Sequence, residues 1–194
     1  GLKLKKTVMI KIAIALGVLV TATLLMKKSG MSYRQSVLKT MYPAIMWASK
    51  SSGKKQIQVN KENVAPAVSF YTLTAKDING NAFNFANLKG KKILIVNTAS
   101  NCGFTAQYEA LEQLSHQFGN KLVIIGFPSN DFKEQEAADN GNIANFCKKN
   151  YGVTFPLMEK SVVIKGSHQN EVHKWLSDMT INGWCHQEPA WNFC

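Results

Sequence analysis

The sequence predicts an α/β fold in which helices cover both faces of a mainly parallel sheet. Two continuous apolar runs, Lys92–Val96 and Lys121–Phe127, are rich in β-branched residues, as is typical of strands buried on both faces. Between them, Tyr108 to Phe118 carries apolar residues at helical spacing. Strands that alternate with helices favour a parallel sheet with helices on either side.

The start of the chain is basic and apolar. Lysines flank the uncharged run Ile12–Met26, and adding residues 8–10 brings it close to the length of a membrane span. We therefore expect residues 1–30 to be a basic leader with one membrane segment at about residues 8–26. No small-residue cleavage site follows, which favours an uncleaved anchor over a signal peptide. Both flanks are positive, so the orientation stays open. Alternatively, Met31 is the true start and the protein is cytoplasmic.

Residues 31–64 are expected to hold an amphipathic helix and a polar linker. The helix would cover residues 31–49, break near Pro43, and lie either on the membrane or on its own domain. Arg34 and Lys39 fall outside its apolar face, which would be formed by Tyr33, Val37, Met41, Ile45 and Met46. The lysine-rich stretch from residue 49 to 63 is the predicted linker.

The remaining residues, 65–194, form the predicted globular domain. It opens with a β-hairpin, because Asn79-Gly80 lies between the apolar runs Val68–Thr74 and Ala82–Phe85. After the two central strands, we expect a helix at residues 140–150, a short strand at 161–165 and a helix at 170–177.

Charge and cysteine spacing exclude several classes of function. Residues 1–60 carry ten lysines, Arg34 and no acidic residue, whereas the rest of the chain carries twelve charges of each sign. The domain is therefore neutral, which argues against nucleic-acid binding. The four cysteines form no CxxC pair, the histidines lack ligand spacing, and there is no Gly-rich phosphate loop. We expect no metal and no cofactor.

Cys102 follows the first central strand and precedes the helix at 108–118. The free amide groups and positive dipole end of a helix N-terminus favour a thiolate, which is the nucleophilic form of cysteine. The alternative is an inert packed cysteine, since free cysteines are often buried.

Four sequence blocks resemble the glutathione peroxidase family, in its cysteine-containing, thioredoxin-dependent branch. They are NTASNCGFT at 97–105, GFPSNDFKEQE at 126–136, FCKKNYGVTFPLMEK at 146–160 and WNF at 191–193. The resemblance runs from about Ala65 to Phe193 and implies a thioredoxin-like fold. It also implies that Cys102 is the peroxidatic cysteine, with polar partners Gln135, Trp191 and Asn192.

The resemblance implies a thiol peroxidase that reduces hydrogen peroxide and organic or lipid hydroperoxides. Neutral donors such as amides and an indole can hold a thiolate over a wide pH range. Cys147 would be the resolving cysteine, which requires local unwinding of residues 139–150. Thioredoxin or glutathione would be the reductant, and the short connection before Trp191 resembles that of monomeric members.

The sequence also departs from the family. Ala137-Ala138 replaces a usual Pro-Gly, and the chain stops at Cys194 where the family continues with further strands and a helix. We therefore expect a C-terminally incomplete domain. Two other functions stay open: a membrane-tethered thioredoxin-like disulfide oxidoreductase, which the absence of CxxC disfavours, and a non-catalytic redox sensor.

Overall fold

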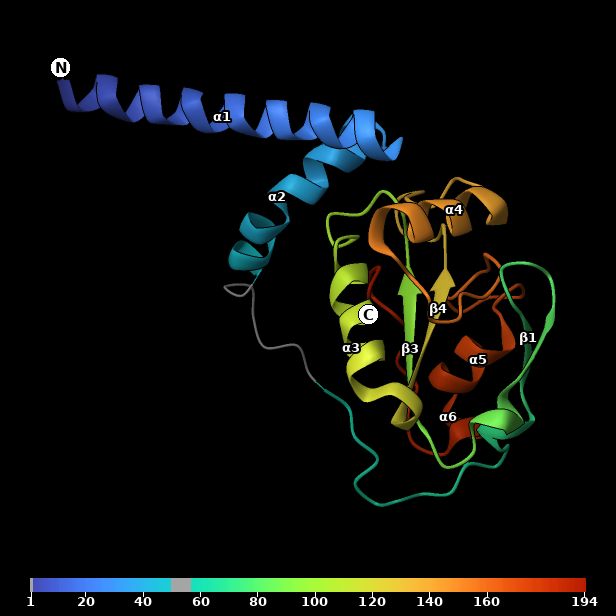
Figure 1. Ribbon diagram of the computed structural model, residues 1–194. Helices are drawn as coiled ribbons and strands as arrows, with labels where there is room; N and C mark the ends of the chain where they lie inside the picture. The colour runs from blue at the N-terminus through green and yellow to red at the C-terminus, as the bar shows by residue number, and fades with distance from the viewer. Residues whose placement is uncertain (1, 50–56) are drawn as a thin grey trace.

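The computed structural model describes residues 2–49 and 57–194 (Figure 1). Two helices come first, α1 (Leu2–Ser29) and α2 (Tyr33–Ser49), and an α/β domain follows. The domain contains strands β1 (Thr74–Lys76), β2 (Ala82–Asn84), β3 (Lys92–Thr98) and β4 (Leu122–Pro128). Its helices are α3 (Gln107–Phe118), α4 (Asn140–Tyr151), α5 (Glu171–Ser177) and the single turn α6 (Met179–Asn182).

The centre of the domain is the parallel pair β3–β4, which α3 connects. The register runs from Lys92 opposite Leu122 to Thr98 opposite Pro128, so both strands end at the same edge. Residues 156–158 run beside β4: the Gly126 amide donates to Pro156 O at 2.9 Å and the Met158 amide to Gly126 O at 2.8 Å. A Cβ at Gly126 would lie 2.6 Å from a Leu157 methyl, so any larger residue there would require the Leu157 side chain to move. The predicted strand, helix and strand are confirmed.

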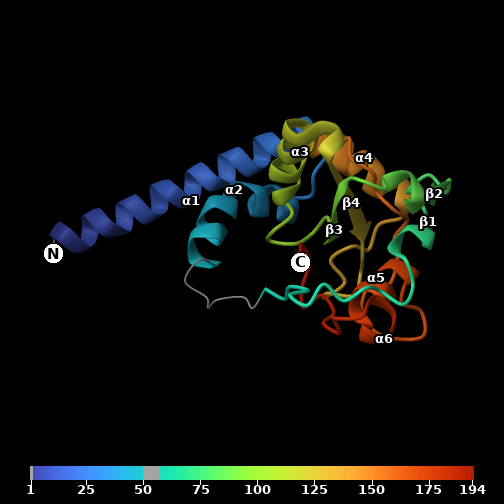
Figure 2. The same ribbon diagram turned by 90° about the horizontal axis from the view of Figure 1, so that it is seen from below.

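Helices cover both faces of this pair. Figure 2 shows α3 and α4 on one side and α5 and α6 on the other. The first side buries a cluster that includes Cys102, Tyr108, Ile124 and Cys147, and the second buries Ile125 and Phe127 with their neighbours. Because successive β4 residues point to opposite faces, Ile124 and Ile125 serve different clusters.

The predicted hairpin is present but shorter than expected. β1 and β2 pair antiparallel, and the Asp77 carboxylate accepts the amides of Asn79 and Asn81 at 2.9 Å each. Gly80 has φ +87°, a conformation that glycine adopts at little cost. The first strand starts at Thr74 rather than at Val68, since Phe70–Thr72 forms a 3₁₀ turn capped by Ser69.

The strand expected at residues 161–165 is wrong. One carboxylate oxygen of Asp131 accepts the amides of Val163 and Ile164, at 2.6 and 3.2 Å. These amides are thus occupied by a side chain, and a single bridge between Val162 and Gln169 remains. A buried backbone needs partners but not necessarily a neighbouring strand, and here the loop carboxylate supplies them.

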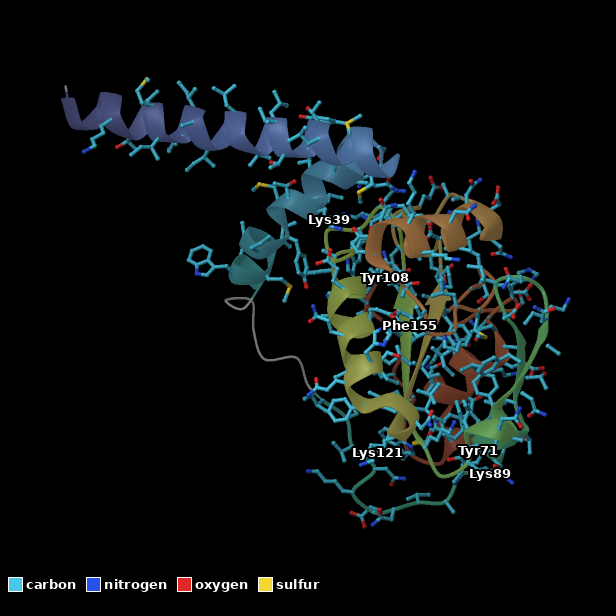
Figure 3. All side chains as sticks on the ribbon, in the orientation of Figure 1. Lys39, Tyr71, Lys89, Tyr108, Lys121 and Phe155 are labelled. Carbon is cyan, nitrogen blue, oxygen red and sulfur yellow. The ribbon has the colours of Figure 1, made fainter. Side chains whose placement is uncertain are left out.

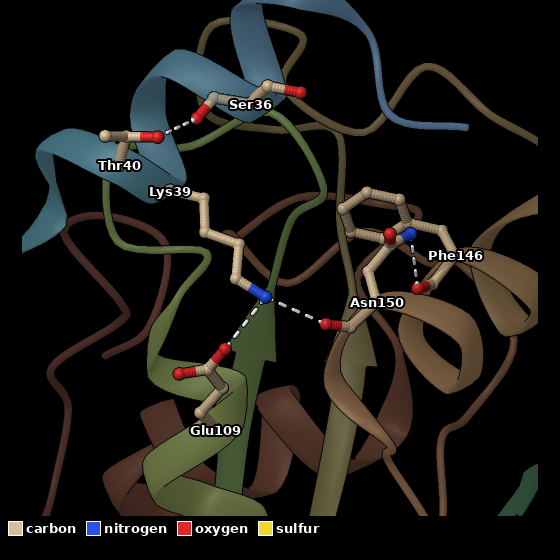
Figure 4. Close-up of polar contacts among 6 residues, drawn as sticks. All are labelled: Ser36, Lys39, Thr40, Glu109, Phe146 and Asn150. Carbon is tan, nitrogen blue, oxygen red and sulfur yellow. Dashed lines mark hydrogen bonds and ion pairs between the residues drawn. The ribbon is translucent and has the colours of Figure 1, made fainter. Parts of the chain in front are cut away.

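Helix α2 packs on the domain through a face that contains Lys39. The Lys39 ammonium contacts Glu109 of α3 at 2.8 Å and Asn150 O at the end of α4 at 2.9 Å (Figure 4), and it lies over the Tyr151 ring. Tyr33 and Met41 are exposed instead, so the predicted apolar face is wrong at Tyr33, Lys39 and Met41. The long aliphatic stem of lysine explains the difference, because it packs while its charge finds partners.

The break expected near Pro43 is also wrong, because α2 continues through it. Residues on both sides of this proline contact the domain, Lys39 and Tyr42 before it and Ile45 after it. Of the predicted linker, residues 50–56 lie outside the described part of the chain.

Helix α1 extends away from the domain in both ribbon views (Figures 1 and 2). Its segment Lys6–Leu24, 19 residues, is long and apolar enough to cross a membrane. Most of its large apolar side chains are exposed, including Ile10, Leu16 and Leu24. This composition suits either a membrane anchor or a signal sequence.

Candidate active site

Cys102 lies in a series of turns between β3 and α3. Thr105 fixes the loop: its hydroxyl donates to Ala99 O at 2.7 Å and accepts the Cys102 amide at 3.0 Å. The Phe104 amide points at the Cys102 sulfur, with an N–Sγ distance of 3.4 Å. α3 begins only at Gln107, so the local donor is a turn amide rather than the helix terminus expected from the sequence. Cys102 is 1% exposed.

Gln135 and Asn192 meet beside this loop, although 57 residues separate them. The Asn192 side-chain amide donates to Gln135 Oε1 at 3.0 Å, and both residues are buried. The Gln135 backbone carbonyl accepts the amide of Asn101 at 3.0 Å, which ties this loop to the residue before Cys102. The structure thus brings the two predicted polar partners together, next to the Cys102 loop.

Trp191 belongs to a C-terminal segment that Asn97, near the end of β3, holds in place. The Asn97 side-chain amide donates to Trp191 O at 2.9 Å, and the Phe193 and Cys194 amides donate to Asn97 O and Oδ1 at 2.7 and 3.1 Å. The indole packs on the Phe132 ring, with centroids 5.8 Å apart. One strand residue therefore sets the position of the whole C-terminal segment.

Cys147 is completely buried in α4, in the same cluster as Cys102. Burial raises the pKa of its thiol to about 12, the Tyr108 hydroxyl opposes this rise, and the charge of Glu136 adds to it. The helix is capped at both ends: Asp139 accepts the Asn142 amide, and the Gly152 amide donates to Cys147 O. Both cysteines are free thiols.

The sequence alone did not single out Glu136 and Ser100. Glu136 is fully buried, and its Oε2 accepts the Ser100 amide at 2.8 Å and the Ser100 hydroxyl at 2.9 Å. Burial raises the pKa of Glu136 to about 7, although the Ser100 donors and the charge of Lys160 oppose that rise. The sequence signal that could have drawn attention to Glu136 was its position next to Gln135. A glutamate in a polar loop is, however, ordinarily exposed to solvent.

Comparison with known proteins gives consistent results. A sequence profile described as glutathione peroxidase matches residues 70–177. The chain is 45% identical over 126 residues to glutathione peroxidase-like peroxiredoxin 2 of Saccharomyces cerevisiae, a match that covers 64% of this chain and 77% of that protein. The chain belongs to the glutathione peroxidase family. Membership makes it a thiol peroxidase, an oxidoreductase with a thioredoxin-like fold.

Two further members of the family are similar to this chain. Hydroperoxy fatty acid reductase gpx1 of Synechocystis is 43% identical over 110 residues, covering 56% of this chain and 64% of that protein. Among solved structures, one described as "Crystal structure of Trgpx in apo form" has 34% sequence identity and a TM-score of 0.48, covering 66% of this chain and 75% of that one.

Proposed function

We propose that this family member reduces hydrogen peroxide and organic hydroperoxides through Cys102, with Gln135, Trp191 and Asn192 as its polar partners. The observation that carries the proposal is the meeting of three distant segments: the Cys102 loop, the loop of Gln135 and the segment of Asn192. They are joined by the Asn192–Gln135 bond and by the Asn101–Gln135 bond. A purely structural cysteine would not need such a set of neutral donors.

In the first step, the Cys102 thiolate attacks one peroxide oxygen. An S–O bond forms and the O–O bond breaks, so the sulfur is oxidised to a sulfenic acid and the peroxide is reduced to water or an alcohol. The second oxygen leaves as an anion and takes up a proton. The Phe104 amide points at the Cys102 sulfur, and the Asn192 side-chain amide can turn from Gln135 Oε1 to the leaving oxygen.

In the second step, the Cys147 sulfur attacks the sulfenic sulfur of Cys102: an S–S bond forms, the S–O bond breaks, and the oxygen leaves as water with the proton of the Cys147 thiol. A thiol, thioredoxin or glutathione, then reduces this disulfide. Because Cys147 is buried within a helix capped at both ends, α4 must open locally to complete this step. We place the protein, a monomer, at a membrane through α1, where peroxidised lipid would be a substrate within reach.

The test is peroxide consumption by the full chain with thioredoxin, thioredoxin reductase and NADPH. Turnover should fall to the background rate in Cys102→Ser and persist in Cys194→Ser, a matched change of the exposed cysteine. Oxidation of Cys102 without turnover would support a redox sensor instead. Turnover that survives in Cys102→Ser would disprove the assignment of the nucleophile.

A further inference from the structure

Helix α2 lies against the Cys102 loop, although the proposed chemistry does not use it. The Gln35 side-chain amide donates to Ser100 O at 3.3 Å, two residues before the cysteine. Directly after the cysteine, a Cβ on Gly103 would lie 3.6 Å from Ile45 Cδ1. One helix therefore contacts the loop on both sides of Cys102.

The contact from Gln35 is built into the first turn of α2. The Ser32 amide donates to Gln35 Oε1 at 2.8 Å, and the Gln35 amide donates to the Ser32 hydroxyl at 3.2 Å. This reciprocal pair is a capping box, which satisfies two backbone amides at the start of a helix. Because the cap holds the side-chain oxygen of Gln35, its NH₂ group is directed to the Cys102 loop.

Further contacts hold α2 on the domain. The Lys39 ammonium contacts Glu109 of α3 at 2.8 Å (Figure 4). Met31, which precedes α2, is buried in the cluster that contains Cys102, and Tyr42 packs against this cluster. The contacts extend along most of α2, so the helix as a whole is held beside the loop.

The groups of the proposed site are closed to solvent in this arrangement. Cys102, Gln135 and Asn192 are 1%, 7% and 2% exposed. A hydroperoxide must nevertheless bring an oxygen to the Cys102 sulfur before an S–O bond can form. Hydrogen bonds join the segments of Gln135 and Asn192 to each other and to the Cys102 loop, whereas α2 contributes none of the proposed reacting groups. Displacement of α2 would therefore open the site without dismantling it.

We propose that α2 is a lid over Cys102 that selects hydroperoxides by size, with Gln35 and Ile45 as its specificity-determining residues. Hydrogen peroxide needs only a small displacement of the lid, whereas a bulky organic hydroperoxide, that of a lipid included, reacts only after the contacts of both residues open. The inference rests on the proposed function of Cys102 as the nucleophile. It concerns access to the sulfur, not the chemistry that follows.

The contacts that hold the lid are weak enough to open during turnover. One neutral hydrogen bond, or the packing of one half-buried isoleucine, changes the ratio of closed to open states by about fivefold. Removing either contact should therefore raise the open fraction, and with it the rate for a bulky hydroperoxide, by about the same factor.

The experiment measures how fast hydrogen peroxide and cumene hydroperoxide oxidise Cys102 in the reduced full chain in detergent micelles. Samples are quenched in acid, freed of peroxide and denatured. Iodoacetamide then labels the remaining thiols, and mass spectrometry counts the unoxidised Cys102.

The first comparison needs no variant, because N-acetylcysteine in the same micelles gives the ratio of the two rates for a thiol without a lid. The ratio is independent of the thiolate fraction, since both peroxides react with the same thiolate. The native chain should discriminate against cumene hydroperoxide more strongly than N-acetylcysteine does. An equal ratio would overturn the inference.

Ile45→Ala and Gln35→Ala remove the two contacts in separate proteins. In each, oxidation by cumene hydroperoxide should become about fivefold faster, and oxidation by hydrogen peroxide should change less. Met41→Ala is the matched control, because it truncates an apolar side chain on the exposed side of α2, and it should leave both rates unchanged.

Three results with these variants would also overturn the inference. They are unchanged rates in Ile45→Ala and Gln35→Ala, an equal change with both peroxides, and an equal change in Met41→Ala. The second would mean that the variants alter the thiolate rather than its access, and the third that α2 acts through its general stability.

The same measurements separate this inference from the proposed function. If hydrogen peroxide does not oxidise Cys102 in the native chain, the proposed function fails and the inference fails with it. If hydrogen peroxide oxidises Cys102 but the variants leave the ratio of the two rates unchanged, the inference alone fails.

Discussion

The two thiols of the site are almost equally buried, yet their surroundings differ in kind. Cys102 is 1% exposed and Cys147 is 0% exposed. Cys102 lies in a loop of turns, with a backbone amide directed at its sulfur. Cys147 lies inside α4, where burial and the charge of Glu136 raise the pKa of its thiol and the Tyr108 hydroxyl lowers it. Burial alone therefore does not distinguish the two thiols, but the groups around each sulfur do.

Under the proposed function, this difference corresponds to an order of reaction. Cys102 would meet the peroxide first, and Cys147, whose pKa burial raises to about 12 within a capped helix, would react after α4 opens. Burial in α4 would then protect Cys147 from direct oxidation. The following substitutions test this difference between Cys102 and Cys147, in order from the largest expected effect to the smallest.

Cys147→Ser removes the second of the two thiols and should prevent the proposed disulfide from forming. We expect thioredoxin-supported turnover to fall by about a hundredfold or more, roughly 2.7 kcal/mol in barrier, while one equivalent of peroxide is still reduced. Rapid mixing for the first turnover and the coupled NADPH assay for steady state measure the two quantities. Cys185→Ser is the control, a buried cysteine outside the cluster that holds Cys102 and Cys147. Unchanged steady-state turnover in Cys147→Ser would show that another group resolves the sulfenic acid.

Glu136→Gln should change how stability depends on pH. The pKa of Glu136 is raised from 4.5 to about 7 in the folded state, so the folded protein binds this proton more tightly than the unfolded chain. The stabilisation is complete below about pH 4.5 and is lost as pH rises to about 7, amounting to about 3 kcal/mol.

His173 acts in the opposite direction, because burial lowers its pKa to about 4. Its contribution is complete above about pH 6.5 and is lost as pH falls toward 4. The informative quantity is therefore the difference between native and variant proteins in urea unfolding between pH 4.5 and 7.5. That difference should change steadily with pH, and a constant difference would show that Glu136 has no raised pKa.

Asp139→Ala should weaken the helix that holds Cys147. Asp139 caps α4 by accepting the Asn142 amide at 2.8 Å, and losing such a cap costs about 1 kcal/mol. If opening of α4 limits the resolving step, the disulfide should form about fivefold faster after a peroxide pulse. The matched control is Asp178→Ala, which removes the same kind of cap from α6 on the other face of the sheet. Equal rates in all three proteins would mean that α4 does not open before the limiting step.

Lys39→Met should have the smallest effect. It keeps the aliphatic stem but removes the charge that joins Glu109 to the last turn of α4. Because Glu109 is half-exposed, the loss should be about 0.5 kcal/mol or less in thermal unfolding, and it should shrink in high salt. Lys89→Met, at an exposed position far from α4 (Figure 3), is the control. A loss as large as that of Asp139→Ala would make α2 a structural part of the Cys147 region.

The sequence predicted those features that depend on local chemistry. The β-branched runs predicted β3 and β4, Asn79-Gly80 predicted the hairpin, and helical spacing predicted α3 and α4. The motif blocks predicted that Gln135 and Asn192 lie together, and a hydrogen bond joins them. Each of these signals lies within a short stretch of chain or within a known motif.

Features that depend on distant partners could not be predicted. Residues 161–165 have a strand-like composition, but the Asp131 carboxylate accepts the amides of Val163 and Ile164. The sequence pattern predicts that Lys39 is a solvent-exposed charge. Its partners nevertheless lie on α3 and α4, 70 and 111 residues away. Burial of Glu136 is likewise a property of the assembled domain. In each case a side chain contacts a group that is distant in the sequence, so no short stretch of sequence contains both partners.

The dependence of the C-terminal segment on Asn97 has a practical consequence. Three hydrogen bonds join this one β3 residue to Trp191, Phe193 and Cys194. The proposed site residues Trp191 and Asn192 therefore belong to one segment that a single residue of the sheet holds in place. Hydrogen exchange at the Phe193 and Cys194 amides would measure how often these bonds open.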